Sequence, residues 1–144
     1  LALEQVGLAG KEVTNYLHLS EGQKQLCILA RTLVSDSRLL LLDEPESALD
    51  FRHRYRMLEL VRDWVNKAHG GAVVALHDPV LALNRCDRLM VLKDGRVLDT
   101  LCPRQDSLGK MEQVLGEVYG PVSLHLIKDR TGKTGLTMLK EGES

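Results

Sequence analysis

Two short apolar runs constrain the fold of this 144-residue chain more than any other feature. Leu39–Leu42 and Ala72–Leu76 are each followed at once by polar residues, which is typical of strands that are buried on both faces of a sheet. Between them, apolar residues recur at helical spacing from Met57 to Ala68, and Gly70-Gly71 ends that pattern. This strand–helix–strand order predicts an α/β protein with a mainly parallel sheet flanked by helices.

The remaining segments predict further helices and a short antiparallel C-terminal edge. Ser20 and Gln23 form a capping box at the start of a helix that we expect to reach about Val34. Asp78-Pro79 should begin a short helix, and Asp94-Gly95 is a dipeptide favoured in two-residue hairpin turns. The expected edge strands and last helix are Arg88–Lys93, Arg96–Leu101, a helix from Ser107, Ser123–Ile127 and Leu136–Leu139.

Composition excludes several classes of function. With 19 basic and 20 acidic residues and a formal net charge of -1, the chain offers no electrostatic footprint for nucleic acid. Its apolar runs are far shorter than the roughly 20 residues that span a bilayer. The first residues lack the features of a signal peptide and resemble the interior of a longer chain. Three widely separated cysteines indicate neither a disulfide framework nor a zinc site, so we expect a reducing compartment.

The polar residues after the two apolar runs form a candidate site. In parallel α/β sheets, ligands bind beyond the carboxyl ends of the strands. Asp43 ends the first run and is suited to hold a hydrated Mg²⁺ through a bound water. Glu44 points to another side of the strand end and can act as a general base toward an attacking water. His77 follows the second run, so its ring should lie near the same edge.

Four sequence elements in fixed order resemble the ATP-binding cassette (ABC) ATPases. They match the signature motif, the Walker B strand, the D-loop and the switch histidine, which here read Leu19–Gln23, Leu39–Pro45, Ser47–Asp50 and His77. The resemblance implies the C-terminal part of a P-loop NTPase (RecA-like) domain. It also implies that the substrate is ATP, that the cofactor is Mg²⁺, and that the reaction is hydrolysis by in-line attack of water.

The resemblance assigns roles to individual residues. Glu44 and His77 take the catalytic positions, and Asp43 takes the metal position. Ser20, Gly22 and Gln23 begin a helix that would face the γ-phosphate of a nucleotide held by a partner subunit, an end suited to anions through its free N–H groups. Asp50 would contact the opposite subunit. The chain departs from the family pattern at Glu21, where Gly is usual, and at Glu46, where Thr is common.

The resemblance covers only part of a cassette. Thr131–Thr134 has the Gly-Lys-Thr ending of a phosphate loop, but the required earlier glycine is replaced by Ile127, so we interpret it as a turn. The 144 residues therefore contain neither a Walker A loop nor a Q-loop, and the chain by itself should be inactive. We expect residues 1–34 to end a helical subdomain, 35–139 to form the second half of the ATPase core and 140–144 to be a disordered tail.

The resemblance also predicts partners and a location. These are a second ATP-binding subunit in a head-to-tail dimer, transmembrane permease subunits, and indirectly a substrate-binding protein, with the chain at the cytoplasmic face of the cell membrane. Glu112–Leu115, Glu117–Gly120 and the Asp129–Leu139 hairpin are most similar to importers of iron-siderophore, haem or cobalamin complexes. Two alternatives stay open, a soluble ABC ATPase of DNA repair or translation and a non-enzymatic truncated half-domain.

Overall fold

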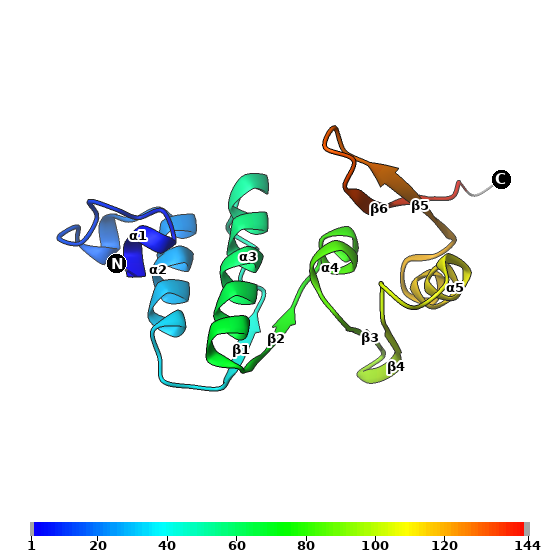
Figure 1. The fold of residues 1–144 in the computed structure, drawn as a ribbon, viewed down its shortest axis with the longest axis horizontal. Helices are drawn as coiled ribbons and strands as arrows, with labels where there is room; N and C mark the ends of the chain where they lie inside the picture. Colours follow the sequence, from blue (N-terminus) through cyan, green and yellow to red (C-terminus); the bar gives the residue numbers. More distant parts are fainter. Residues whose placement is uncertain (1, 143–144) are drawn as a thin grey trace. The chain divides into compact units, whose positions relative to one another are not determined.

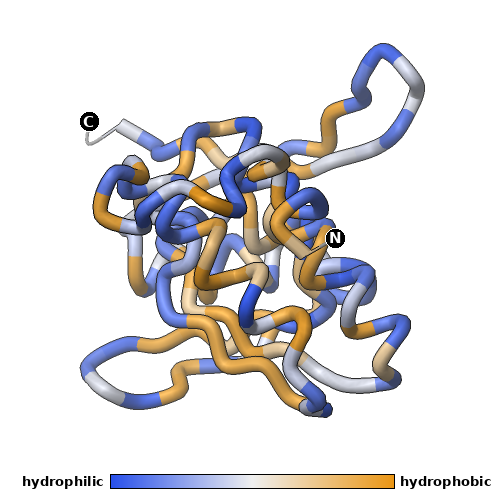
Figure 2. Tube along the Cα trace, turned by 90° about the vertical axis from the view of Figure 1, so that its left-hand side faces the viewer, coloured by the Kyte–Doolittle hydropathy of each residue, from blue (hydrophilic) through white to orange (hydrophobic). Residues whose placement is uncertain are grey.

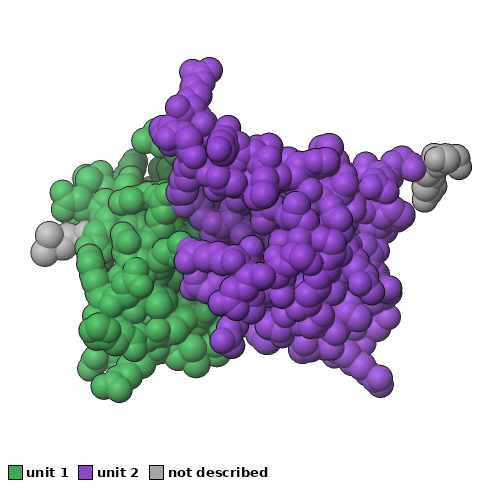
Figure 3. Space-filling model, turned by 45° about the vertical axis from the view of Figure 1, so that its right-hand side comes forward, with its two compact units in different colours: residues 1–77 green, residues 78–144 purple. Residues whose placement is uncertain are grey.

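The computed structural model describes residues 2–142 and divides into two compact units, residues 1–77 and 78–144 (Figures 1 and 3). The first unit contains α1 (Ala2–Gln5), a 3₁₀ turn η1 (Tyr16–His18), α2 (Glu21–Leu33), β1 (Leu39–Asp43), α3 (Phe51–Ala68) and β2 (Gly71–Ala75). The second contains α4 (Pro79–Arg85), β3 (Leu89–Lys93), β4 (Arg96–Leu101), α5 (Leu108–Tyr119), β5 (Val122–Lys128) and β6 (Thr134–Lys140). Every helix and strand named in the sequence analysis is present, and α1 and η1 are additions to them.

The first unit is built around the predicted strand–helix–strand order. β1 and β2 pair in parallel, with Leu39 opposite Gly71 and Asp43 opposite Ala75, and α3 is the crossover between them. α2 and α3 are amphipathic. Figure 2 shows that hydrophobic (orange) and hydrophilic (blue) residues are interspersed along the chain. Their buried residues are Leu26, Leu29 and Ala30 on α2 and Met57, Leu58, Leu60 and Val61 on α3.

The prediction that β1 is buried on both faces is wrong for the described residues. Leu40 is 2% exposed, whereas its neighbour Leu41 is 72% exposed. Side chains on a strand alternate between the two faces of the sheet, so this pattern means that one face is covered and the other is open. Leu39 and Val73 are also exposed, and no described segment covers them.

The end of α3 differs from the predicted glycine cap. The left-handed residue there is His69, with φ of 47°, whereas Gly70 serves another purpose. A Cβ atom at Gly70 would lie 2.4 Å from the carbonyl oxygen of Arg38, and the Gly71 N–H donates to that same oxygen at 2.8 Å. Gly70 therefore permits a close backbone approach that sets the start of the β1–β2 register.

The second unit closes its own core with two antiparallel hairpins and α5. β3 pairs with β4 across Asp94 and Gly95, whose φ angles of 50° and 73° fit the predicted two-residue turn. β5 pairs with β6 from Val122 opposite Lys140 to Lys128 opposite Thr134. One cluster of buried residues joins α4, α5 and the hairpins; its members are Leu83, Val91, Leu101, Met111, Leu115, Val122, Leu124 and Leu136.

The C-terminal tail begins later than the sequence indicated. Lys140 is the last residue of β6, and the Glu141 N–H donates to the carbonyl of Pro121 at 2.9 Å, so the disorder expected from residue 140 is corrected at these two positions. Residues 143–144 lie outside the described part of the chain. The predicted boundary between residues 34 and 35 falls inside the first unit and stays a prediction. Between residues 2 and 142, no helix combines the length and apolar character needed to cross a bilayer.

Candidate functional site

The end of β1 places two carboxylates side by side. Asp43 is the last residue of the strand and pairs with Ala75, so the ladder fixes its backbone. The chain turns at once at Glu44, whose φ of 45° lies in the left-handed region and whose N–H donates to the Ala75 carbonyl at 3.2 Å. Non-glycine residues rarely adopt this conformation, and they do so where the surrounding structure enforces it. That the Asp43 and Glu44 side chains point to different sides of the strand end stays a prediction.

Glu44 and His77 meet at the carboxyl end of the sheet. Glu44 Oε1 lies 2.7 Å from His77 Nε2, although the two residues are 33 positions apart in the sequence. The His77 side chain is 74% exposed, so packing does little to hold the ring and this contact orients it. A carboxylate that bonds a ring nitrogen selects the histidine tautomer and the orientation of the imidazole. The structure thus brings together the two residues that the sequence predicted to be catalytic.

The start of α2 has the predicted cap. The Gln23 N–H donates to Ser20 Oγ at 3.3 Å and the Ser20 N–H donates to Gln23 Oε1 at 3.1 Å, which completes a capping box. A Cβ at Gly22 would lie 2.9 Å from the Ala48 carbonyl oxygen, so this helix start rests against the loop between β1 and α3. In the described residues Ser20 bonds to Gln23, and it makes no hydrogen bond to Asp43, Glu44 or His77.

Glu21, the departure in the signature motif, turns toward solvent. Its side chain is 79% exposed and Oε1 accepts from Lys24 Nζ at 2.7 Å, one helical turn along α2. The ammonium group offsets the carboxylate charge near the helix start. Glu21 therefore leaves the N–H groups of the first turn open to an anion.

Asp50 caps α3 and is held by His53. One carboxylate oxygen accepts from the His53 N–H at 2.9 Å and lies 2.8 Å from His53 Nδ1. The backbone bond first, and the side-chain bond second, lower the pKa of Asp50 from its ordinary value. Arg54 adds a bond from Nε to the Leu49 carbonyl at 2.8 Å, so the end of this loop has a defined conformation.

Glu46 is the residue whose importance the sequence analysis missed. It is 3% exposed and is the buried charged residue of the described chain. Its Oε1 accepts from the His77 N–H at 3.1 Å, so it contacts the same residue as Glu44 does. The sequence did hold a signal, because Glu46 departs from the threonine common at this position in the resembled family.

The donor set at the strand end fits Mg²⁺. This ion keeps several waters and uses one or two carboxylates together with substrate phosphates. Asp43 is exposed at the end of β1, next to Glu44, and the described residues contain no cluster of three or more protein ligands that would form a closed cage. A single carboxylate at an open edge suits a metal that arrives with a phosphate.

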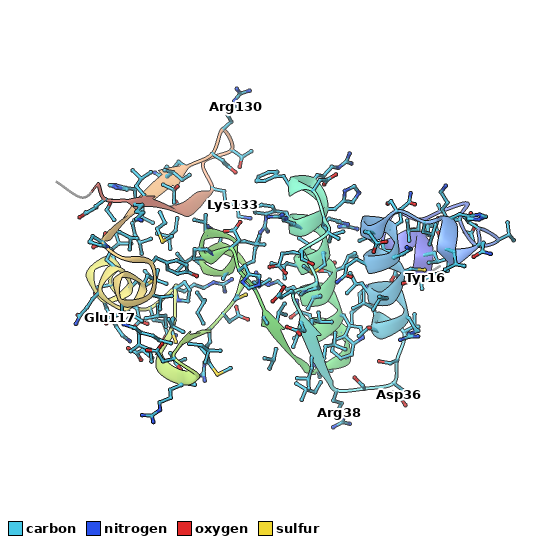
Figure 4. The ribbon with its side chains drawn as sticks, turned by 180° about the vertical axis from the view of Figure 1, so that it is seen from behind. Tyr16, Asp36, Arg38, Glu117, Arg130 and Lys133 are labelled. Carbon is cyan, nitrogen blue, oxygen red and sulfur yellow. The ribbon has the colours of Figure 1, made fainter. Side chains whose placement is uncertain are left out.

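The Gly-Lys-Thr segment forms the predicted turn. Asp129 Oδ1 accepts from the N–H groups of Thr131 and Lys133, at 2.8 and 3.0 Å, and from Thr131 Oγ1. These bonds lower the pKa of Asp129, with that from the Thr131 hydroxyl as the largest cause. Arg130 lies at the tip of the β5–β6 turn and points away from the strands (Figure 4). A carboxylate of the chain itself thus occupies the N–H groups that a phosphate loop would offer to its ligand.

Comparisons with known proteins agree with this architecture. Residues 6–84 match the family described as "AAA domain, putative AbiEii toxin, Type IV TA system". The chain is 40% identical over 119 residues to aliphatic sulfonates import ATP-binding protein SsuB 2 of Paraburkholderia xenovorans, which covers 83% of this chain and 48% of the relative. It is 42% identical over 103 residues to cobalamin import ATP-binding protein BtuD of Halobacterium salinarum, an alignment that covers 72% of this chain and 26% of the relative. The chain thus spans about half or less of these curated relatives.

Solved structures show the same fold. An inward-facing metal-chelate type ABC transporter superposes with a TM-score of 0.80 at 24% identity, over 97% of this chain and 55% of that one. A dimeric ATP-binding cassette bound to ADP and Pi superposes with a TM-score of 0.64 at 29% identity, over 73% of this chain and 45% of the cassette chain. An archaeal ribosome recycling factor superposes with a TM-score of 0.70 at 26% identity, over 99% of this chain and 27% of the factor. The shared fold is that of ABC-type P-loop NTPase domains.

Proposed function

Because this chain belongs to the AAA-domain family and is homologous to the ATP-binding subunits of ABC transporters, we propose that it supplies the hydrolytic half of an ATP site. The observation that carries the proposal is the 2.7 Å contact between Glu44 Oε1 and His77 Nε2 at the carboxyl end of β1 and β2. A base and a proton-carrying ring are thereby placed together at the edge where α/β sheets bind ligands.

In the proposed mechanism, Glu44 orients a water and accepts its proton as the water attacks the γ-phosphorus of ATP. The bond from that phosphorus to the bridging oxygen breaks, and ADP leaves. His77 holds the Glu44 carboxylate through Nε2 and presents its ring to the phosphate. Asp43 would hold Mg²⁺ through water, and the bound ion would neutralise charge on the phosphate oxygens. In this proposal the left-handed turn at Glu44 would direct the base away from the neighbouring metal ligand.

We further propose that the working unit is a head-to-tail dimer. Ser20, Gly22 and Gln23 would face the γ-phosphate of the partner's nucleotide, and Asp50 would contact the partner subunit. Two observations support this: the capped α2 start makes no bond to this chain's own Asp43, Glu44 or His77 within the described residues, and the similar ADP-bound cassette is dimeric. The free N–H groups of a helix start are suited to bind phosphate.

The proposed role is to power an importer, as a peripheral subunit against transmembrane permease subunits. The sulfonate and cobalamin import proteins among the relatives support import as the direction. The narrower proposal, import of iron-siderophore, haem or cobalamin complexes, has support from the cobalamin relative and from the metal-chelate type transporter. A ribosome-associated ATPase is a second candidate, because the recycling factor matches nearly the whole chain.

Replacement of Glu44 by Gln tests the proposal in the intact protein that carries this chain. We expect steady-state ATP hydrolysis to fall by about a hundredfold or more, because a general base contributes about 10²–10⁴ to the rate. ATP affinity should change little, since the amide keeps the shape and one acceptor. The exposed Glu4→Gln serves as the matched control. Parental turnover in Glu44→Gln would exclude Glu44 as the base.

A further inference from the structure

The loop after β1 contains a buried carboxylate, Glu46, that in the described residues bonds to neither the proposed metal ligand nor the proposed base. Glu46 directly follows Pro45, is 3% exposed, and lies in a loop whose neighbours Ser47 and Ala48 are exposed. Burial of a carboxylate is costly unless partners compensate for its lost hydration. The described residues give it one bond, from the His77 N–H to Oε1 at 3.1 Å, and Oε2 is buried without a partner. A glutamate buried in this way is not a solvated surface charge, so its position in the loop calls for a structural role.

The only bond that the Glu46 side chain makes within the described residues ends on His77. The β1–β2 ladder stops at Ala75, two residues earlier, so sheet pairing does not fix the His77 backbone. The His77 ring is mostly exposed, so packing does not fix it either. What holds this residue is a pair of glutamates two positions apart, with Glu46 on its backbone N–H and Glu44 on its ring.

The loop that carries Glu46 has a defined conformation. The Ser47 N–H donates to the Glu44 carbonyl at 3.1 Å and the Leu49 N–H donates to the Glu46 carbonyl at 3.0 Å. Leu49 is itself buried. Glu46 is therefore a fixed anchor, and a bond from a fixed anchor restricts where the His77 backbone can lie.

We propose that Glu46 is a positioning residue for hydrolysis: its buried carboxylate fixes the His77 backbone, and this alignment lets the ring meet both Glu44 and the γ-phosphate. This inference rests on the function proposed above. It assigns Glu46 no contact with ATP. Because Oε2 makes no bond, the feature that matters is one acceptor atom at Oε1 and not the negative charge.

The acceptor requirement separates two substitutions of similar size. Glu46→Gln keeps a carbonyl oxygen that can accept from the His77 N–H, whereas Glu46→Leu removes it. In the intact protein we expect Glu46→Leu to lower kcat about ten- to a hundredfold, the scale of a small misplacement near the chemistry. The KM for ATP should stay within about twofold, and Glu46→Gln should keep kcat within about threefold of the parent.

A double-mutant cycle with His77→Ala tests whether Glu46 acts through His77. If it does, Glu46→Leu should lower kcat much less in the His77→Ala background than in the parent. An equal loss in both backgrounds would overturn the proposal, as would a loss in Glu46→Gln that matches the loss in Glu46→Leu. If Glu46→Leu fails to fold, Glu46→Thr takes its place, because its hydroxyl lies two bonds closer to the backbone than Oε1 and leaves the N–H without its acceptor.

A second readout keeps this proposal separable from the proposed function. In the same intact protein with ¹⁵N-labelled histidine, Glu46→Leu should move the His77 amide and ring resonances, and Glu46→Gln should leave them near their parental positions. This result does not depend on ATP turnover. If Glu44→Gln hydrolyses ATP at the parental rate while Glu46→Leu still moves the His77 resonances, only the hydrolytic function is overturned. If the His77 resonances do not move in Glu46→Leu, the role of Glu46 is overturned.

Discussion

The β1–β2 pair and the two C-terminal hairpins bury their leucines in different ways. On β1, Leu40 is covered and Leu41 is exposed, whereas on β4 Leu101 has no exposed surface. The hairpins and α5 enclose a shared cluster, although the hairpins also leave leucines exposed, among them Leu92, Leu126 and Leu139. The two regions therefore differ less in exposure than in their cores, because the buried residues of the hairpin region form one cluster with α5. Precise placement at the strand ends rests on hydrogen bonds there more than on enclosure.

The largest expected effect concerns ATP binding by the 144-residue chain itself. The sequence contains the hydrolytic residues Asp43, Glu44 and His77 but no Walker A loop, whose backbone N–H groups and lysine surround the β- and γ-phosphates. We expect isothermal titration calorimetry with Mg²⁺ and ATP to detect weak binding or none, and a phosphate-release assay to detect no hydrolysis. Micromolar affinity would reveal a nucleotide site that neither region accounts for.

A matched pair of leucine truncations compares the two regions directly. Leu101→Ala should lower the free energy of unfolding by about 2–5 kcal/mol, because it leaves a cavity in an enclosed cluster. Leu41→Ala should change it by about 0.5 kcal/mol or less, since the side chain is 72% exposed. Denaturant unfolding followed by far-UV circular dichroism measures both. A cost for Leu41→Ala as large as that for Leu101→Ala would mean that the open face is covered in solution.

The smallest expected effects are pKa changes at one aspartate in each region, Asp50 in the first and Asp106 in the second. The pKa values of Asp50 and Asp106 are both lowered, and the largest cause in each is a backbone N–H, from His53 and Cys102 respectively. Their stabilising contributions are therefore present above the ordinary value of 3.8 and are lost as pH falls through the lowered pKa.

Side-chain truncation separates the backbone cause from the side-chain cause. His53→Ala and Lys110→Ala remove the side-chain partners of these aspartates but keep the backbone donors. We expect carboxyl ¹³C titrations to show both pKa values still lowered, though less than in the parent. A return to the ordinary value in either variant would show that the side chain is the main cause.

Local signals predicted the secondary structure well because they act over a few residues. Two of these signals are helix caps, which accept hydrogen bonds from backbone N–H groups of the next turn, and the third is a tight turn. All three are present as predicted: Ser20 with Gln23, Asp78 before Pro79, and Asp94-Gly95. The glycine cap of α3 was misplaced because the need for Gly70 comes from Arg38, which is distant in the sequence. The prediction that Lys140 belongs to a disordered tail was wrong, because its pairing with Val122 is a long-range contact that local signals do not show.

The sequence by itself determined which residues can do chemistry and at which strand ends they stand. Asp43, Glu44 and His77 follow apolar runs, and the carboxyl ends of parallel strands meet at one edge whatever else the chain does. Only the tertiary structure decided which atoms touch. The bond between Glu44 and His77 and the bond from the His77 N–H to Glu46 each join residues about thirty positions apart in the sequence. Contacts of that kind are fixed by packing and chain path, which spacing and propensity do not encode.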